Sequence, residues 1–342
     1  MGGIETQVSG LVSYQKTQGE EVFVLTLTPG DDFGGVHRFV FKLPGNFLWH
    51  PRGKSLIRKA LQELKPDVVH LHFGAVSPFA WDGMRAVREL NIPSVATVHS
   101  IWGTFARKMY ALTAKNWHSK TVFSSVSRIA SSIVQESLHR EVSIAHNGVD
   151  IDFWKSAISS ESEKIEIVSA TRFATRKRIR AQILVIEQVV KNLAENSPHF
   201  TIAGTGPDFK NVELLIKKKN LQKYITLTGR LDRFQLRDLY AKSDLFLQMS
   251  ILEAFGIAAC EARAAGLPVL TRQGSGVEEF VDSGNTGYLE SSDAEIVLRI
   301  MQLASDRNLM RMLKTRSKES PPIQNWDHAA NQLVKLYQQA IS

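Results

Sequence analysis

The segment that decides the fold reads SILEAFGIAACEARAAGLPV and occupies residues 250–269. A short apolar run at 245–248 directly precedes it and predicts a strand, and 256–265 has the pattern of a helix. A second apolar run at 269–271 predicts the next strand. A strand, a loop, a helix and another strand in this order are typical of a parallel α/β sheet with crossover helices.

The same alternation continues outward along the whole chain. Helical segments separate most of the apolar runs, so the sequence predicts an α/β protein with two doubly wound, Rossmann-like domains. The expected strands lie near 22–27, 36–41, 68–71, 94–98, 121–124 and 142–144 in the first half and near 165–169, 200–203, 225–228, 245–248 and 269–271 in the second.

Two breaks in the pattern suggest the domain boundaries. Periodicity disappears in 154–164, where Ser and Glu dominate, and this composition indicates a linker. Pro321 and Pro322 end a long helical stretch, after which a helical pattern resumes. The expected divisions are an N-terminal Rossmann-like domain at 1–153, the linker at 154–164, a second Rossmann-like domain at 165–320 and a C-terminal helical segment at 321–342 that packs back toward the N-terminal domain.

The start of the chain departs from the doubly wound pattern. Such a domain normally opens with a strand that leads into a glycine turn. Here Gly2 and Gly3 follow Met1 at once, and a helical pattern comes next. We expect either that the true start lies upstream or that the N-terminal domain lacks its first strand.

Composition limits the class of protein. With 43% hydrophobic and 22% charged residues, the 342-residue chain can fill two cores. No apolar run approaches the ~20 residues of a membrane-spanning helix, and the N-terminus does not resemble a signal peptide. Cys260 is the only cysteine, which excludes an internal disulfide and a thiolate metal cluster. We therefore expect a cytoplasmic protein.

A formal net charge of +8 favours anionic partners. Nucleic acid is not an expected partner, because the sequence contains no recognisable nucleic-acid-binding module and no single basic stripe. An acid-free stretch at 34–62 combines basic and aromatic residues. This stretch favours either an anionic membrane surface as partner, with the protein peripheral on the inner face of the membrane, or a strand core with a solvated loop.

The loop at 253–257 has the chemistry of a phosphate site. Free backbone N–H groups and the helix dipole attract anions to a helix N-terminus. Glu253 in the loop and Glu261 about two turns into the helix could accept hydrogen bonds from hydroxyl groups on either side of a phosphate. The alternative is that Glu253 only stabilises the helix dipole and that Glu261 is a solvated surface residue.

Two glutamates separated by seven residues, in this setting, resemble the donor-site signature of glycosyltransferase family 4, which comprises retaining enzymes of the GT-B fold with two domains facing across a cleft. Further segments follow in the order of that family. They are HNGVD at 146–150, ATRFATRK at 170–177, IAGTGP at 202–207, LTGRL at 227–231, GSGVE at 274–278 and NTGYL at 285–289, the last two taken as a loop and a turn.

The resemblance implies the roles of most site residues. It assigns the donor diphosphate to Arg172 and Lys177, and a donor-site role to Glu253. It implies donor binding by Glu261, the amides of Phe255, Gly256 and Ile257, and by Gly3, Gly206 and Arg230. The nearby Arg176, Arg178 and Arg180 are interpreted as a solvated helix entry.

Histidines dominate the motifs of the first half. PDVVHLH at 66–72 and TVH at 97–99 resemble two strand ends of the family, and the resemblance places His99 beside the transferred sugar. A satisfied strand-end histidine is the alternative for His99. His70 and His72 are interpreted as structural, because no third metal ligand is apparent.

The expected function is transfer of a sugar from a nucleotide-diphosphate sugar to a hydroxyl acceptor, a glycan or glycolipid precursor, with retention of anomeric configuration. The activity is that of a retaining, hexosyltransferase-type enzyme. No cofactor or metal is expected, since two cations and a helix terminus can neutralise the diphosphate. The alternative is a nucleotide-sugar-binding protein without catalysis, owing to the shortened first domain.

Overall fold

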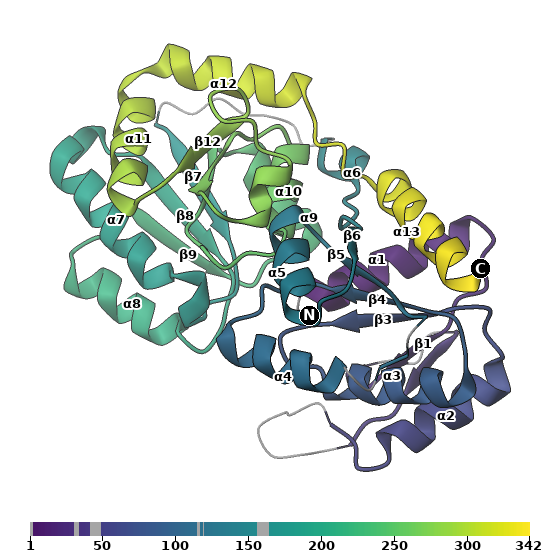
Figure 1. Ribbon diagram of the computed structural model, residues 1–342. Helices are drawn as coiled ribbons and strands as arrows, with labels where there is room; N and C mark the ends of the chain where they lie inside the picture. The colour runs from purple at the N-terminus through teal and green to yellow at the C-terminus, as the bar shows by residue number, and fades with distance from the viewer. Residues whose placement is uncertain (1–2, 31–33, 42–48, 115–116, 119, 156–163) are drawn as a thin grey trace. The chain divides into compact units, whose positions relative to one another are not determined.

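The computed structural model describes residues 3–30, 34–41, 49–114, 117–118, 120–155 and 164–342. The chain forms two compact units, which Figure 1 shows as separate groups of strands and helices. Unit 1 comprises Met1–Gly148 and Trp326–Ser342, and unit 2 comprises Val149–Asn325. The chain therefore leaves unit 1 once and returns to it.

Unit 1 is built on a parallel sheet with the strand order β3-β4-β5-β6, and β1 and β2 form a separate parallel pair. Its first helix begins at Gly3, and within the described residues no strand precedes it. The elements are α1 (Gly3–Thr17), β1 (Val24–Thr26), β2 (Val36–Arg38), α2 (Gly53–Leu64), β3 (Val69–Phe73), α3 (Pro78–Leu90), β4 (Ser94–Val98), α4 (Thr104–Ala114), β5 (Val122–Ser125), α5 (Arg128–Leu138), β6 (Val142–Ile144) and α13 (Trp326–Ile341).

Local sequence explains where the elements of unit 1 begin. Every residue of β4 is buried, as expected for an inner strand of a parallel sheet covered on both faces. Helix α5 begins after Ser127, whose side chain accepts a hydrogen bond from the amide of Ala130. Helix α3 has Pro78 as its first residue, where the missing N–H is tolerated.

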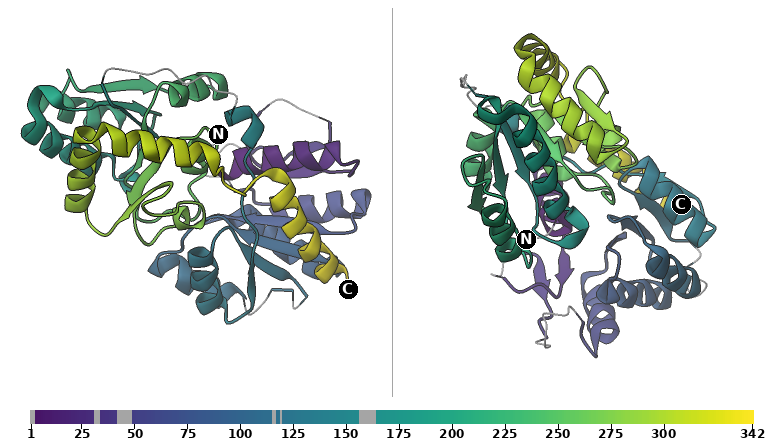
Figure 2. Two further views of the ribbon diagram at one scale, coloured as in Figure 1. Left: turned by 90° about the horizontal axis from the view of Figure 1, so that it is seen from above. Right: turned by 90° about the vertical axis from the view of Figure 1, so that its left-hand side faces the viewer.

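The two ends of the chain meet in unit 1, where α1 and α13 lie side by side (Figure 2). Leu333 and Leu336 of α13 share a hydrophobic cluster with Leu11 and Val95. A Cβ added to Gly10 would lie 2.2 Å from the Trp326 ring, and one added to Gly148 would lie 2.3 Å from it. Glycine is therefore required at both positions for this packing.

Unit 2 contains a six-stranded parallel sheet with the order β12-β11-β10-β7-β8-β9. Its elements are α6 (Ile151–Lys155), β7 (Glu166–Ala170), η2 (Thr175–Lys177), α7 (Ile179–Leu193), η3 (Ala194–Asn196), β8 (His199–Ala203), α8 (Phe209–Lys218), β9 (Ile225–Gly229), α9 (Arg233–Ala241), β10 (Leu245–Gln248), α10 (Ile257–Ala264), β11 (Val269–Arg272), η4 (Gly276–Glu279), β12 (Gly287–Glu290), α11 (Asp293–Ser305) and α12 (Arg307–Glu319).

Side chains of unit 2 alternate between the two faces of the sheet. Leu245 and Leu247 of β10 belong to the large core cluster that also contains residues of α7, α8 and α11. Phe246, between them, packs against Tyr240 instead, with ring centroids 5.8 Å apart. This period of two is the geometry of a strand buried on both faces.

The sequence did not predict β12, because residues 285–289 were interpreted as a turn. In the structure Val269 of β11 pairs with Gly287 and Leu270 with Tyr288. The Asn-Thr-Gly turn signal precedes a very short apolar run, and pairing with β11 makes that run a strand. The local pattern alone is too short to indicate a strand.

The start of the predicted linker also differs from the prediction. Trp154, expected to open the linker, lies in α6 and is 1% exposed, with its ring centroid 5.4 Å from that of Tyr240. Burial of this large side chain ties the start of the Ser- and Glu-rich segment to unit 2. Of the predicted linker at 154–164, residues 156–163 lie outside the described residues.

Candidate active site

The candidate site lies in unit 2 where the strand order changes direction. From β7 the chain proceeds to β8 and β9 on one side and then crosses to β10, β11 and β12 on the other. In open α/β sheets, ligands bind outside the carboxyl ends of the strands at such a switch point. The loops after β7 and β10 are therefore the expected ligand-binding elements.

An ion pair joins these two loops. Lys177, in η2 after β7, donates through Nζ to Oε2 of Glu253, which follows β10. The two side chains retain only 17% and 16% of their exposure. Two residues that are 76 positions apart in sequence thus meet at the switch point, as the proposed donor site requires.

The helix N-terminus beside this pair is open for an anion. Gly256 precedes α10 with φ 88° and has no side chain that could cap the amides of the first turn. A Cβ at Gly256 would lie 2.7 Å from Cγ2 of Val277. Phe255 is buried against Phe280, with ring centroids 5.3 Å apart, and this packing anchors the loop that leads to Ile257.

A buried donor next to this helix lacks a partner. Among the residues that the structure describes, the Nε2 atom of Gln248, the last residue of β10, is buried without a hydrogen bond. It lies 3.4 Å from the position that a Cβ on Gly256 would occupy. A buried polar atom without a partner costs free energy, and a bound ligand is one way to satisfy it.

Glycines allow the neighbouring loops to pack closely. Gly276 donates its amide to the carbonyl of Glu253 at 2.8 Å, and a Cβ there would lie 2.0 Å from the carbonyl oxygen of Ala254. A Cβ at Gly206 would lie 2.3 Å from the carbonyl oxygen of Phe173. The loops after β11 and β8 therefore support the loops that carry Glu253 and Arg172.

Two predicted basic residues lie outside the ion pair. Arg172 is exposed in the loop after β7, five residues before Lys177. Arg230 is exposed directly after β9, which is the edge strand of the sheet, two strands away from β7. The structure brings Lys177 and Glu253 together, and Arg172 lies on the same loop as Lys177.

Glu261 lies on α10 in a partly buried position. Packing around its carboxyl group raises the pKa of Glu261 to about 8, although the positive charge of Arg233 opposes this shift. Arg233 pairs with Asp150 at 2.9 Å and lies 3.8 Å above the Phe153 ring. Glu261 is therefore not the fully solvated surface residue of the alternative interpretation.

The raised pKa of Glu261 predicts a pH dependence of stability. The pKa of Glu261 is 4.5 in the unfolded chain and about 8 in the folded protein, so the folded protein binds this proton more tightly. The contribution of this proton to folding stability is therefore complete below pH 4.5 and is lost as the pH rises through about 8. Glu261→Gln cannot ionise, and its melting temperature should fall less than that of the wild type between about pH 5 and 9. Thermal unfolding across this range measures the effect. Glu319→Gln, an exposed position, is the control, and identical pH profiles for all three proteins would contradict the prediction.

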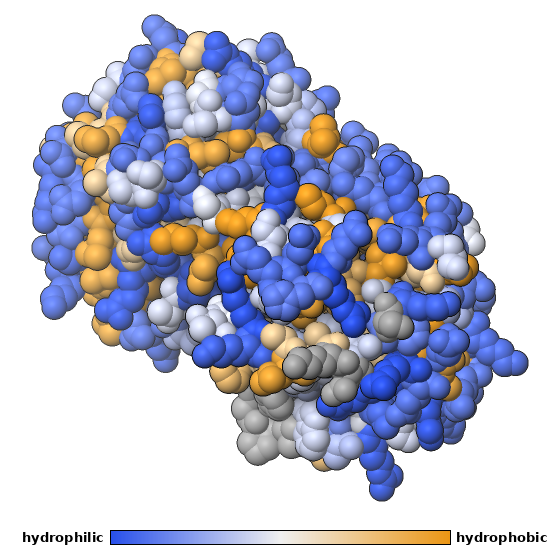
Figure 3. Space-filling model, viewed as in Figure 1, coloured by the Kyte–Doolittle hydropathy of each residue, from blue (hydrophilic) through white to orange (hydrophobic). Residues whose placement is uncertain are grey.

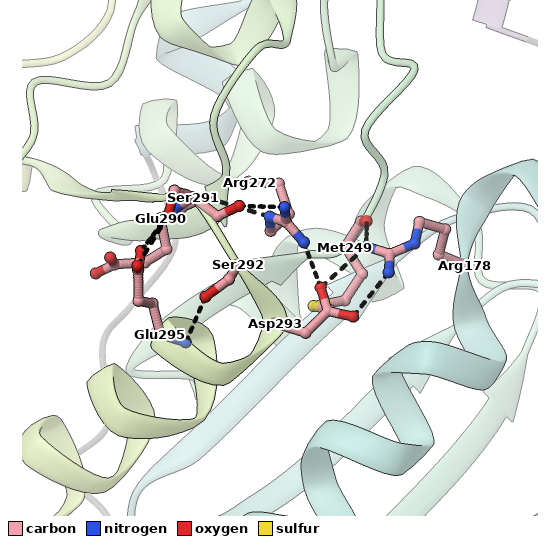
Figure 4. A network of polar contacts seen from close by, with 8 residues as sticks. All are labelled: Arg178, Met249, Arg272, Glu290, Ser291, Ser292, Asp293 and Glu295. Atoms are coloured by element: carbon pink, nitrogen blue, oxygen red, sulfur yellow. Dashed lines mark hydrogen bonds and ion pairs between the residues drawn. The ribbon is translucent and has the colours of Figure 1, made fainter.

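A network behind the site joins two arginines to one carboxylate (Figure 4). Arg178 contacts both carboxylate oxygens of Asp293, with Nη2 2.7 Å from Oδ2 and Nη1 3.1 Å from Oδ1. Arg272 reaches the same carboxylate, with Nη1 2.5 Å from Oδ1. Partial burial works against ionisation, but hydrogen bonds from both arginines lower the pKa of Asp293.

This network corrects the interpretation of Arg178 as part of a solvated helix entry. Arg176 and Arg180 are exposed as expected, whereas Arg178 is partly buried and paired. Arg178 and Asp293 are 115 residues apart. No motif in the sequence links them, and Asp293 alone resembles an ordinary acidic residue in the first turn of a helix.

The histidines of unit 1 form a chain of contacts in partly buried positions. Nδ1 of His72 lies 2.9 Å from Nε2 of His99, and the His99 ring also has a hydrogen bond with Asn147. His70 contacts Thr97 at 2.7 Å and Tyr337 at 2.9 Å. Burial lowers the pKa of His99 to about 4 and that of His70 to about 3, so both rings are neutral near pH 7.

These contacts agree with the alternative interpretation of His99 as a strand-end histidine with satisfied hydrogen bonds. Its position beside the transferred sugar stays a prediction. Gly3 also belongs to unit 1, where it is the exposed first residue of α1. Over the described part of the chain, no group of three or more His, Cys, Asp or Glu side chains is arranged to hold a metal ion.

Comparison with known proteins identifies the family. The family described as Glycosyl transferases group 1 matches residues 150–320, and Glycosyltransferase Family 4 matches residues 1–153. The chain therefore belongs to the group 1 glycosyl transferases, and the predicted membership of family 4 is confirmed.

Individual proteins agree with this assignment. Alpha-monoglucosyldiacylglycerol synthase from Acholeplasma laidlawii is 24% identical over 94% of this chain and 89% of its own length. The phosphatidylinositol N-acetylglucosaminyltransferase GPI3 subunit of Saccharomyces cerevisiae is 25% identical over 82% of this chain and 65% of its own length. The Anabaena protein Alr3699/HepE, solved with UDP and glucose, is 17% identical with a TM-score of 0.76, covering 98% of this chain and 95% of its own. The predicted GT-B fold class is confirmed by this likeness.

Proposed function

We propose that this glycosyltransferase moves a sugar from a nucleoside diphosphate sugar to a hydroxyl group of a glycolipid or glycan precursor, with retention of anomeric configuration. One observation carries the proposal. Lys177 and Glu253 meet at the switch point of the unit 2 sheet, beside the uncapped N-terminus of α10. Cationic and amide donors around one point suit a pyrophosphate.

Each group has a proposed role toward the donor. Glu253 holds Lys177 in place, and Lys177 together with the amides of Gly256 and Ile257 neutralises charge on the departing pyrophosphate. The unpaired Nε2 of Gln248 offers a further donor beside the same helix. Arg172, Arg230 and Gly206 complete the proposed donor surface of unit 2, and Glu261 accepts a hydrogen bond from the ribose.

The proposed chemistry needs no protein base. The bond between the anomeric carbon and the phosphate oxygen breaks, and its electron pair goes to the pyrophosphate. The acceptor oxygen bonds to the anomeric carbon on the same face, and its proton passes to the departing phosphate oxygen. We assign the acceptor to unit 1. His99, at the carboxyl end of β4, keeps its proposed role as the polar group beside the transferred sugar, and Gly3 keeps its proposed role in donor binding.

We also propose that the acceptor is lipid-linked and that unit 1 associates peripherally with an anionic membrane surface. Phe105 and Leu112 are 75% and 71% exposed on one stripe of α4, with exposed Lys108 between them. On the face drawn in Figure 3, hydrophobic residues lie in separate patches among hydrophilic ones. In the described residues, every helix is too short or too polar to cross a bilayer. Sedimentation with phosphatidylglycerol vesicles tests the association, and equal recovery with neutral phosphatidylcholine vesicles would reject the anionic surface.

A donor panel tests the function. UDP-, GDP- and ADP-sugars are added to the wild-type protein, and the melting temperature is recorded. A matching donor at 100 times its Kd should add about 2.7 kcal/mol, or about 5 to 10 °C for a domain of this size. Release of the nucleoside diphosphate in the presence of diacylglycerol vesicles then measures turnover. Stabilisation without turnover on any lipid or glycan acceptor would favour the non-catalytic binding protein, and no stabilisation by any donor would reject the proposal.

A further inference from the structure

Arg178 has a backbone conformation that arginine rarely adopts. It stands between η2 and α7 with φ 55° and ψ 33°, in the left-handed region. A residue with a Cβ is disfavoured there, and glycine is the usual choice. Such a conformation persists only where the surrounding structure enforces it.

The side chain of Arg178 contacts two segments that are distant in sequence (Figure 4). Its guanidinium group forms a two-point pair with Asp293 at the start of α11. The same group donates to the carbonyl oxygen of Met249 at 3.3 Å. Met249 directly follows β10, so one side chain connects the start of α7, the end of β10 and the start of α11.

The connected segments are those that carry the ion pair of the donor site. Lys177 precedes Arg178 directly, and its amide donates to the carbonyl oxygen of Ala174 at 2.8 Å. Glu253 lies four residues after Met249. Arg178 therefore connects the backbone next to Lys177 with the segment that leads to Glu253.

A second arginine holds the carboxylate from the other side. Arg272, at the end of β11, pairs with Asp293 and also donates to the carbonyl oxygens of Glu290 and Ser291. Asp293 thus has little freedom to follow Arg178 if the loop moves. A bidentate arginine pair on an anchored carboxylate is a rigid connection.

We propose that Arg178, held by Asp293 and the carbonyl oxygen of Met249, is a positioning residue that presents Lys177 to the donor pyrophosphate. The inference rests on the proposed function of the site. The inference adds two points to that function. Arginine occupies this left-handed position because its side chain binds Asp293 and Met249, and these contacts control donor affinity through Lys177.

The test is a thermodynamic cycle with Arg178→Gly and Lys177→Ala. Glycine relieves the backbone conformation while removing the side chain, and Asp293→Asn breaks the same contact from the other partner at nearly constant volume. Calorimetry with UDP, GDP and ADP as probes measures Kd for each variant. Arg180→Ala, on the exposed face of α7, removes one nearby positive charge and is the matched control.

We expect Arg178→Gly and Asp293→Asn each to raise the Kd of the bound nucleoside diphosphate about tenfold, or ~1.4 kcal/mol. In the Lys177→Ala background the same changes should have no further effect, because coupled residues are not additive. Arg178→Lys should restore part of the affinity, and Arg180→Ala should bind as the wild type does.

Two outcomes overturn the inference and are distinguishable. Equal affinity in the wild type and in both Arg178→Gly and Asp293→Asn, or full additivity with Lys177→Ala, means that Arg178 supports the fold only. Absence of binding of all three probes to the wild type rejects the proposed donor site itself, and the inference with it. Thermal unfolding of each variant separates loss of affinity from loss of folded protein.

Discussion

Replacement of Lys177 by alanine is expected to lower kcat/KM by about 30- to 1,000-fold. The reason is the position of its ammonium group, which lies largely out of solvent against Glu253 at the carboxyl ends of β7 and β10. Removing an electrostatic donor from developing negative charge typically costs about 2 to 4 kcal/mol of transition-state stabilisation. The variant also leaves Glu253 without its cation, which disfavours an approaching pyrophosphate further.

Steady-state kinetics with the donor identified by the panel measure this effect. Lys218→Ala removes an exposed lysine from α8 of the same unit and is the control for net charge. The wild type, the control and Lys177→Ala should have similar melting temperatures within a few degrees. Unchanged turnover in Lys177→Ala would show that the pyrophosphate is neutralised elsewhere.

Arg263→Met is expected to destabilise unit 2 by about 3 to 5 kcal/mol, because several buried acceptors lose their donor at once and each costs about 1 to 3 kcal/mol. Arg263 lies on α10 and is 1% exposed. Its guanidinium group donates to the carbonyl oxygens of Phe280, Ser317 and Ser320, at 3.4, 3.0 and 2.5 Å, and to the hydroxyl group of Ser317. Methionine fills much of the volume but leaves these acceptors buried without donors.

The expected fall in melting temperature is about 6 to 20 °C for a domain of this size. Burial lowers the pKa of Arg263 to about 10, so the residue remains charged at neutral pH and the comparison is valid there. Arg311→Met, at an exposed position on α12, tests the effect of losing an arginine at the surface. A similar melting temperature for Arg263→Met and Arg311→Met would mean that α10 does not depend on these hydrogen bonds.

The prediction about Arg263 also concerns the site. The same helix begins at Ile257 with the amides proposed to bind phosphate. Arg263 connects its other end to the end of α12 and to Phe280, which follows η4. A phosphate site made of backbone amides depends on a fixed helix. We therefore interpret the buried arginine as the anchor of the donor helix.

The sequence alone was sufficient for the fold class and for the loops that carry the site. Short apolar runs separated by helical segments identify parallel strands, and loops at the carboxyl ends of such strands are where ligands bind. The pattern of Glu253 and Glu261 on one loop and helix is local, as is the basic segment that contains Lys177. Such local patterns can be recognised in the sequence because the periods of strands and helices depend only on neighbouring residues.

The tertiary structure alone decided which of these residues meet. Strand order places the β7 and β10 loops together. Lys177 and Glu253 are 76 positions apart, and no pattern in the sequence pairs them. The same holds for Arg178 with Asp293, and for β12, which becomes a strand by pairing with β11. Burial, which raises the pKa of Glu261 and lowers that of His99, likewise depends on chain segments distant in sequence. Contacts of this kind arise when whole helices and strands pack together. The sequence could therefore indicate which residue types form the site, but not which of them contact one another.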